Sequence, residues 1–256
     1  MMNFLINTVF STTSCDAEIQ LFGVIHLSLM IITFVVGYFM VKYKLRNEFI
    51  EKVSTVIILI LHLLLYVWYF YSNESFIHKA LPLYTCRLVL YLFTIGIFFK
   101  NQFCLKLGTY WGFYGGIAGL LLPSIFKYPF PHILQISTFL LHVYIFLLSG
   151  NYLFVKRIGM NKEDTKMCCK WTIYLLIFNT IFNVIFGTNY TSTMKMPVHL
   201  LNVGFNIPTI FCFAVVAIGY IIATIIQHLV VTKYEENIYN KKSVKEGSIQ
   251  WIYRLI

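Results

Sequence analysis

Seven long apolar segments, separated by short charged loops, constrain this chain of 256 residues more than any other feature. Each has roughly the 17–25 residues that an α-helix needs to cross a bilayer. Because a bilayer offers no water to backbone amides, segments of this kind must be helical. The sequence therefore predicts an all-α integral membrane protein, a bundle of seven transmembrane helices. The segments cover residues 19–41, 53–71, 83–99, 103–126, 132–155, 171–188 and 201–231.

The composition excludes most soluble classes of protein. Hydrophobic residues make up 59% of the chain and charged residues 12%, whereas soluble domains are about a quarter charged. A soluble globular enzyme, a disordered chain and a disulfide scaffold are all incompatible with these values. The cysteines have no zinc-site spacing and the chain contains no phosphate-binding glycine loop, so we expect neither a metal nor a cofactor.

Lys and Arg are distributed asymmetrically among the loops. Sixteen of them fall in segments 42–52, 100–106, 156–170 and 233–254, against three in the loops of the opposite side. Because basic residues collect in cytoplasmic loops, we expect the N-terminus outside and the C-terminus in the cytoplasm. The same bias accounts for the net charge of +10 without a nucleic-acid partner. Residues 1–232 are thus predicted to form the transmembrane domain and residues 233–256 a basic cytoplasmic tail.

The interiors of the apolar segments contain no Asp or Glu. This disfavours proton-coupled transport through an intramembrane acid and aspartyl intramembrane proteolysis. Polar side chains at membrane depth usually face a bundle interior or a water-filled cavity. We therefore expect the polar residues of the outer half to converge on one cavity that opens to the outer leaflet. The polar residues within or beside the segments include His26, His62, Cys86, Arg87, His142, Asn179, Asn183, Asn189 and Tyr190.

These residues also have plain structural interpretations. Interhelical hydrogen bonds would account for the histidines and asparagines, and an isolated cysteine in an apolar helix is usually inert packing. Arg87 either extends to the headgroup region or anchors a lipid phosphate. The five glycines between residues 108 and 119 predict close packing of the fourth segment against its neighbours.

The run Leu81-Pro-Leu-Tyr-Thr-Cys86 favours a reactive cysteine. Proline fits the first turn of a helix, so Pro82 would begin the third helix, with Cys86 one turn further along the same face. The positive end of the helix and the neighbouring Arg87 both favour the thiolate, which is the reactive form. A nearby histidine would complete a Cys–His pair that can attack an ester carbonyl and hold an acyl thioester.

An ordered set of motifs resembles the YwaF family of integral membrane proteins, which includes eukaryotic transmembrane protein 164. The similarity extends from His26 to the end of the seventh segment. The motifs are the Leu81–Cys86 run, the Gly-rich fourth segment ending at Pro123, His142 in the fifth segment, and Gly187-Thr-Asn-Tyr190 followed by Pro197. The resemblance implies a seven-helix protein of a bacterial plasma membrane. It also implies a cysteine-dependent acyltransferase that acts on phospholipids or lysophospholipids.

In that resemblance Cys86 matches the nucleophile and His142 the base. By helix rise, His142 lies about 15 Å below the outer start of its segment, deeper than Cys86. A loop that dips into the membrane would close this gap. Otherwise His26 is the better-placed base, and Thr85 is an alternative nucleophile. We expect the lipid to be contacted by His26, Arg87, Asn183, Asn189 and Tyr190.

Two other functions compete with acyl transfer. Water in place of the acceptor lipid would make the same site a lipid hydrolase. A non-enzymatic transporter or sensor would instead use the polar residues to bind a lipid or small amphiphile in the outer cavity, with Cys86 incidental. The sequence specifies neither the headgroup, the acyl length nor the oligomeric state.

Overall fold

The computed structural model describes residues 5–13, 23–72, 74–122, 128, 131–158, 161–195 and 209–253, and these residues form helices and loops without a strand. The elements are η1 (Leu5–Val9), α2 (Val24–Lys42), α3 (Glu48–Tyr71), α4 (Phe76–Lys79), α5 (Thr85–Phe98), α6 (Gln102–Leu121), α7 (Ile133–Gly150), η2 (Asn151–Val155), α8 (Lys162–Phe186), η3 (Tyr190–Ser192) and α9 (Thr209–Tyr253). The predicted starts of the first and last apolar segments, with Pro123 and Pro197, lie outside the described residues.

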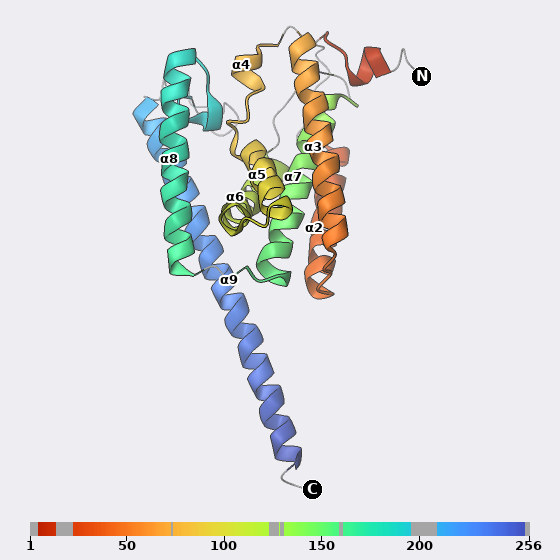
Figure 1. Ribbon diagram of the computed structural model, residues 1–256, viewed down its shortest axis with the longest axis vertical. Helices are drawn as coiled ribbons and strands as arrows, with labels where there is room; N and C mark the ends of the chain where they lie inside the picture. The colour runs from red at the N-terminus through yellow and green to blue at the C-terminus, as the bar shows by residue number, and fades with distance from the viewer. Residues whose placement is uncertain are drawn as a thin grey trace.

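Within the described residues, five helices are long and apolar enough to cross a membrane, which confirms an all-α integral membrane protein. They are α2, α3, α7 continued by η2, α8, and α9 as far as Tyr239. Figure 1 shows these helices running roughly along the long axis of the molecule, whereas α5 and α6 lie among them and are tilted away from that axis. The 14 residues of α5 extend only about 21 Å, less than a hydrocarbon core of about 30 Å. The predicted count of seven spans, to which α5 and α6 would contribute, stays a prediction.

Asparagine caps set the beginnings of three helices. Asn47, Asn101 and Asn161 each accept a hydrogen bond from the backbone N–H three residues later, at the start of α3, α6 and α8. An asparagine in this position pairs a donor that the helix itself leaves free. The caps explain why α3 and α8 begin earlier than the apolar segments, within polar sequence. At its other end α8 stops at Gly187, whose φ of 64° suits a glycine.

The core lies where α5, α6 and α7 pack against one another. It contains Phe93, Tyr110, Ile145 and Leu153, all at most 1% exposed. Glycines let α6 approach α7 closely, because a Cβ at Gly116 would overlap the backbone of Phe146. Part of the glycine-rich face of α6 therefore has the packing role predicted from the sequence.

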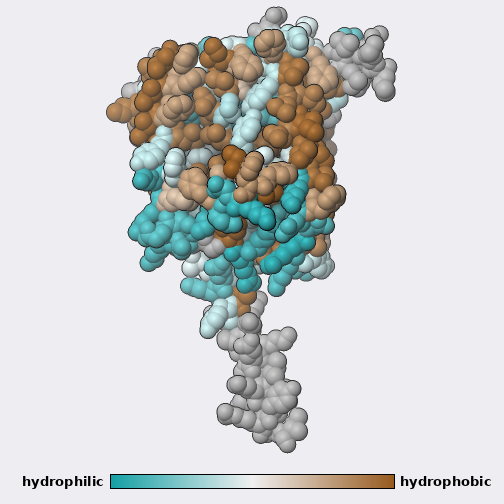
Figure 2. All heavy atoms as spheres, in the orientation of Figure 1, coloured by the Kyte–Doolittle hydropathy of each residue, from teal (hydrophilic) through white to brown (hydrophobic). Residues whose placement is uncertain are grey.

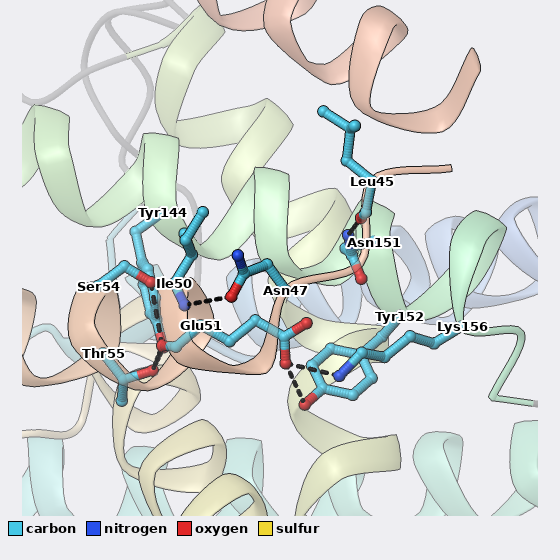
Figure 3. A network of polar contacts seen from close by, with 10 residues as sticks. All are labelled: Leu45, Asn47, Ile50, Glu51, Ser54, Thr55, Tyr144, Asn151, Tyr152 and Lys156. Carbon is cyan, nitrogen blue, oxygen red and sulfur yellow. Dashed lines mark hydrogen bonds and ion pairs between the residues drawn. The ribbon is translucent and has the colours of Figure 1, made fainter. Parts of the chain in front are cut away.

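A polar network ties α3 to the end of α7 at the lower side of the molecule (Figure 3). Lys156 Nζ lies 2.6 Å from a carboxylate oxygen of Glu51, and the Tyr152 hydroxyl donates to the same oxygen over 3.2 Å. Nearby, Asn151 Nδ2 donates to the Leu45 carbonyl over 2.9 Å. Glu51 lies in the first turn of α3 and is 7% exposed. Pairing with Lys156 offsets the cost of burying this carboxylate near the N-terminal end of α3.

The outer surface of the bundle is apolar where lipid would contact it. Exposed Ile, Val, Leu and Phe side chains lie along α2, α3, α8 and α9. Figure 2 shows an apolar upper part on this face and a hydrophilic belt below it. In Figure 1 α9 continues past the belt, away from η1 at the upper side. Residues 233–253 thus extend the last helix without a break.

Candidate active site

A cavity of about 560 Å³ opens among α3, the α4–α5 connection, α5 and α7. Apolar side chains form part of its wall, and charged or hydroxyl-bearing side chains form the rest. The lining residues are His62, Leu65, Tyr69, Glu74, Lys79, Tyr84, Cys86, Arg87, Gly119, Leu122, Tyr128, Leu134, Ser137, Thr138, Leu141 and His142. Cys86 and His142, which the sequence resemblance singled out as nucleophile and base, are both among them. The wall thus has an apolar section and a charged section.

The connection between α3 and α5 carries Cys86 into the bundle. The chain leaves α3 at Tyr71, forms the single turn of α4 and stays non-helical until α5 begins at Thr85. The predicted helix start at Leu83 is therefore two residues early. Because α5 is short, its first turn lies at the cavity, and Cys86 is its second residue. In Figure 1 the start of α5 lies below the upper ends of α3 and α8.

Three side chains hold the non-helical connection in place. Arg87 donates to the carbonyls of Lys79 and Leu81 over 2.6 and 3.2 Å. The Tyr190 hydroxyl donates to the Ile77 carbonyl over 2.7 Å, and Asn179 Nδ2 donates to the Leu83 carbonyl over 3.0 Å. Irregular backbone at membrane depth must find such partners. These contacts fix the start of α5 and with it the position of Cys86.

The Cys86 thiol faces the His142 imidazole across the cavity wall, close enough for the two groups to interact. On its other side, His142 Nδ1 lies 2.7 Å from the Thr138 carbonyl oxygen. A carbonyl can only accept, so Nδ1 carries the proton and Nε2 is left as an acceptor. The tautomer is therefore the one that can take a proton from the thiol. No side-chain carboxylate is needed to orient the ring, since the backbone carbonyl does so.

Gly119 provides the space for the His142 ring. A Cβ built at Gly119 would overlap imidazole atoms Cδ2, Nε2 and Cγ. The sequence analysis assigned this glycine to helix packing together with its neighbours on α6. The structure gives it a more specific role, because its missing side chain lets the imidazole lie between α6 and the cavity.

His26 and Thr85, the alternatives for base and nucleophile, both have partners outside the cavity wall. His26 is fully buried, and its Nε2 lies 2.7 Å from the Leu120 carbonyl oxygen of α6. The Thr85 hydroxyl is hydrogen-bonded to the Tyr220 hydroxyl over 2.9 Å. Neither residue lines the cavity. The structural interpretation of His26, an interhelical hydrogen bond, is the one that this geometry favours.

The residues after α8 form a scaffold rather than a cavity wall. Asn183 donates to the Tyr190 carbonyl and to the Thr193 hydroxyl, and its carbonyl oxygen accepts from Tyr190 N and the Thr188 hydroxyl, all within 2.9 Å. Asn189 caps the following loop through three backbone contacts with Met194 and Lys195. Of the five residues expected to contact the lipid, only Arg87 lines the cavity.

This arrangement predicts that Asn183→Ala destabilises the fold. The change leaves several buried groups without partners, each at a cost of about 1–3 kcal/mol. We expect the detergent-solubilised variant to unfold several degrees below the wild type, with or without added lipid. Asn189→Ala is the matched control, because Asn189 is only partly buried and its loss should cost less. Equal melting temperatures for Asn183→Ala and the wild type would contradict the scaffold role.

The charged end of the cavity was not predicted from the sequence. Glu74 and Lys79 form an ion pair, and the Tyr128 hydroxyl donates to Glu74 over 3.2 Å. Burial, aided by the Glu74 carboxylate, raises the pKa of Tyr128 to about 12, so this hydroxyl remains a donor at neutral pH. The rings of Tyr69 and Tyr84 lie 5.8 and 5.2 Å from the Arg87 guanidinium carbon. Because aromatic residues make up 18% of the chain, composition alone does not single out these rings.

Within the part of the chain that the structure describes, Cys, His, Asp and Glu side chains form no group of three suited to a metal ion.

Comparison with known families identifies the chain's relatives. The model of the TMEM164 family matches residues 10–230, a span that includes every residue of the cavity wall. The family predicted from the sequence motifs is thereby confirmed. Comparisons with curated proteins and with solved structures gave no match.

Proposed function

The chain belongs to the TMEM164 family, and from this premise we propose that it is an integral membrane acyltransferase. It would move a fatty acyl chain between membrane phospholipids and lysophospholipids through a thioester on Cys86. The observation that carries the proposal is the juxtaposition of Cys86 and His142 on the wall of a cavity with apolar and charged sections. In nucleophilic acyl transfer, a thiol can act as the nucleophile and a neighbouring imidazole as its general base.

In the first half-reaction the thiol proton passes to His142 Nε2 while the sulfur attacks the ester carbonyl of a phospholipid. The C–S bond forms and the ester C–O bond breaks. The departing glycerol oxygen takes the proton from His142 and leaves as a lysophospholipid. The acyl chain remains on Cys86 as a thioester.

In the second half-reaction the hydroxyl of an acceptor lysophospholipid attacks the thioester. Its proton passes to His142, the new C–O bond forms and the C–S bond breaks. The thiolate then recovers the proton from His142, which restores the starting state. Water in place of the lysophospholipid would give a free fatty acid, so the same residues also support lipid hydrolysis.

The developing oxyanion would be stabilised by the start of α5. The first N–H groups of a helix have no partner within the helix, and they point towards its N-terminal end. Cys86 is the second residue of α5, so these donors lie beside the reacting sulfur. Preorganised backbone donors of this kind commonly lower the barrier to acyl transfer by several kcal/mol. Asn189 and Tyr190, which were expected to contact the lipid, are engaged in hydrogen bonds of the scaffold and are less suited to this role.

The proposal also specifies how a phospholipid would lie. Leu65, Leu134 and Leu141 offer an apolar wall to the acyl chain, and Arg87 with Lys79 offers cationic groups to the phosphate. We place this cavity in the outer half of a bacterial plasma membrane, with α5 and α6 completing seven membrane helices. The N-terminus would lie outside and the C-terminus in the cytoplasm. The bias of Lys and Arg between the loops supports this orientation.

Intact-protein mass spectrometry tests the proposal directly. We expect purified protein incubated with phospholipid vesicles to gain the mass of one acyl chain, to lose it in neutral hydroxylamine, and to carry it on Cys86. Adding lysophospholipid should then discharge the acyl chain into a new phospholipid. Lipid that remains bound without any acylated protein would contradict the proposal and favour the non-enzymatic transporter or sensor. Discharge into free fatty acid alone would favour a hydrolase.

A further inference from the structure

A second imidazole faces the same cavity. His62 on α3 is 2% exposed and lines the cavity with Leu65 and Tyr69 of the same helix. Its Nε2 is buried and has no hydrogen-bond partner among the described residues. A buried polar atom without a partner costs about 1–3 kcal/mol, and such atoms are rare enough in native proteins to call for an explanation. A bound group that pairs with Nε2 would supply that explanation.

The His62 ring is held in a fixed orientation by aromatic neighbours. The ring of Tyr66 packs edge-on at a centroid distance of 4.9 Å, and that of Tyr91 at 6.5 Å. The hydroxyls of these two tyrosines are hydrogen-bonded to each other over 3.1 Å, which joins α3 to α5. The free nitrogen therefore belongs to a rigid part of the wall.

His62 and His142 lie on two adjacent antiparallel helices, whose register is given by the contacts Thr55–Tyr144 and Trp68–His132. In that register His142 is about four residues, or roughly 6 Å, further down than His62. The Glu74–Lys79 ion pair lies in the connection beyond α3, where Lys79 is half exposed. A lipid with its headgroup at that ion pair would run past His62 towards His142, and its glycerol oxygens would lie between the two imidazoles.

In the resting protein His142 Nδ1 is paired with the Thr138 carbonyl, and its other nitrogen faces the Cys86 thiol. Once the thiol has become a thioester, that nitrogen is free to accept the hydrogen of the acceptor hydroxyl. Two oxygens at the reacting centre then still need a donor, the thioester carbonyl oxygen and the hydroxyl oxygen. The start of α5 suits the carbonyl oxygen, and the unpaired Nε2 of His62 suits the hydroxyl oxygen.

We infer that His62 binds the acceptor hydroxyl of a lysophospholipid, an inference that rests on the proposed function. A hydrogen bond from Nε2 to the hydroxyl oxygen fixes that oxygen beside the thioester. The hydroxyl proton stays free to pass to His142 as the C–O bond forms and the C–S bond breaks. His62 thereby favours transfer to a lysophospholipid over transfer to water, because water lacks the headgroup contacts that hold a lipid oxygen in place.

The test compares binding of 1-acyl lysophosphatidylcholine with binding of its 2-deoxy analogue, which lacks the hydroxyl. We expect the wild type to bind the hydroxyl-bearing lipid about five- to tenfold more tightly, as one net hydrogen bond allows. His62→Phe should remove this preference and leave the affinity for the analogue within about twofold. His62→Gln keeps an amide donor and should restore part of the preference. Leu63→Met, on the exposed face of the same helix and outside the cavity, is the control and should preserve it.

Binding is measured on the full chain in detergent, without turnover, so the result is independent of acylation. An unchanged hydroxyl preference in both His62→Phe and His62→Gln would overturn the inference even if Cys86 forms a thioester. Absence of any preference in the wild type would overturn it as well. A lost preference in His62→Phe, with no thioester on the wild type, would support the hydroxyl site and reject the acyltransfer step alone.

Discussion

Replacing Cys86 with alanine is expected to lower acyl transfer by at least about a thousandfold, the range seen when a covalent nucleophile is removed. The sulfur is the only atom of the proposed mechanism that bonds to the acyl chain, so no other group in the cavity replaces it. The change removes one small atom from the second position of α5, and alanine favours a helix. The variant should therefore fold, and transfer of a labelled acyl chain between lipids in reconstituted vesicles measures its loss.

Two further variants make this result specific. Cys169→Ala removes a partly buried thiol on α8, outside the cavity, and should leave transfer within about twofold of wild type. Thr85→Ala removes the alternative nucleophile, whose hydroxyl is engaged with Tyr220, and should retain most of the activity. Undiminished transfer by a folded Cys86→Ala protein would reject the thioester mechanism. Loss of transfer in Thr85→Ala alone would assign the nucleophile to the neighbouring hydroxyl.

The sequence could predict the membrane helices because bilayer physics acts on each segment separately. Long apolar runs without acidic residues must be helical wherever they lie, and α2, α3, α7 and α8 appear close to their predicted positions. The boundaries moved where local capping extends a helix into polar sequence, as Asn47 and Asn161 do. The short α5 could not be foreseen in the same way. Its start depends on contacts of the preceding connection with Asn179 and Tyr190, about a hundred residues away in sequence.

The candidate site could likewise be predicted from the sequence only in part. The family resemblance singled out Cys86 and His142. The helix rise per residue can compare their depths only if both helices begin at the same level. In Figure 1 α5 begins below the upper ends of its neighbours, so this comparison does not apply. Polarity at membrane depth correctly marked His26 and Asn183 as buried side chains. It could not distinguish a hydrogen bond to a neighbouring helix from one to a lipid, since that depends on the partner and not on the residue.

Gly119→Ala is expected to reduce acyl transfer about a hundredfold, the cost of displacing a catalytic group by roughly an ångström. The added methyl group would occupy the space of the His142 ring, so the imidazole must turn away from the thiol or from the Thr138 carbonyl. Alanine is a better helix former than glycine by about 1 kcal/mol. The global stability of the variant should therefore change less than its activity.

The matched control for this prediction is Gly115→Ala, one turn earlier on α6, where a Cβ would meet no atom within 4 Å. Its activity should equal that of the wild type. Alkylation of Cys86 by a small thiol reagent gives the second measurement, because a displaced His142 no longer accepts the thiol proton. We expect slower alkylation of Cys86 in Gly119→Ala and an unchanged rate in Gly115→Ala. Equal alkylation rates and equal transfer in the two variants would mean that the imidazole tolerates the methyl group, and that Gly119 serves helix packing as the sequence pattern first indicated.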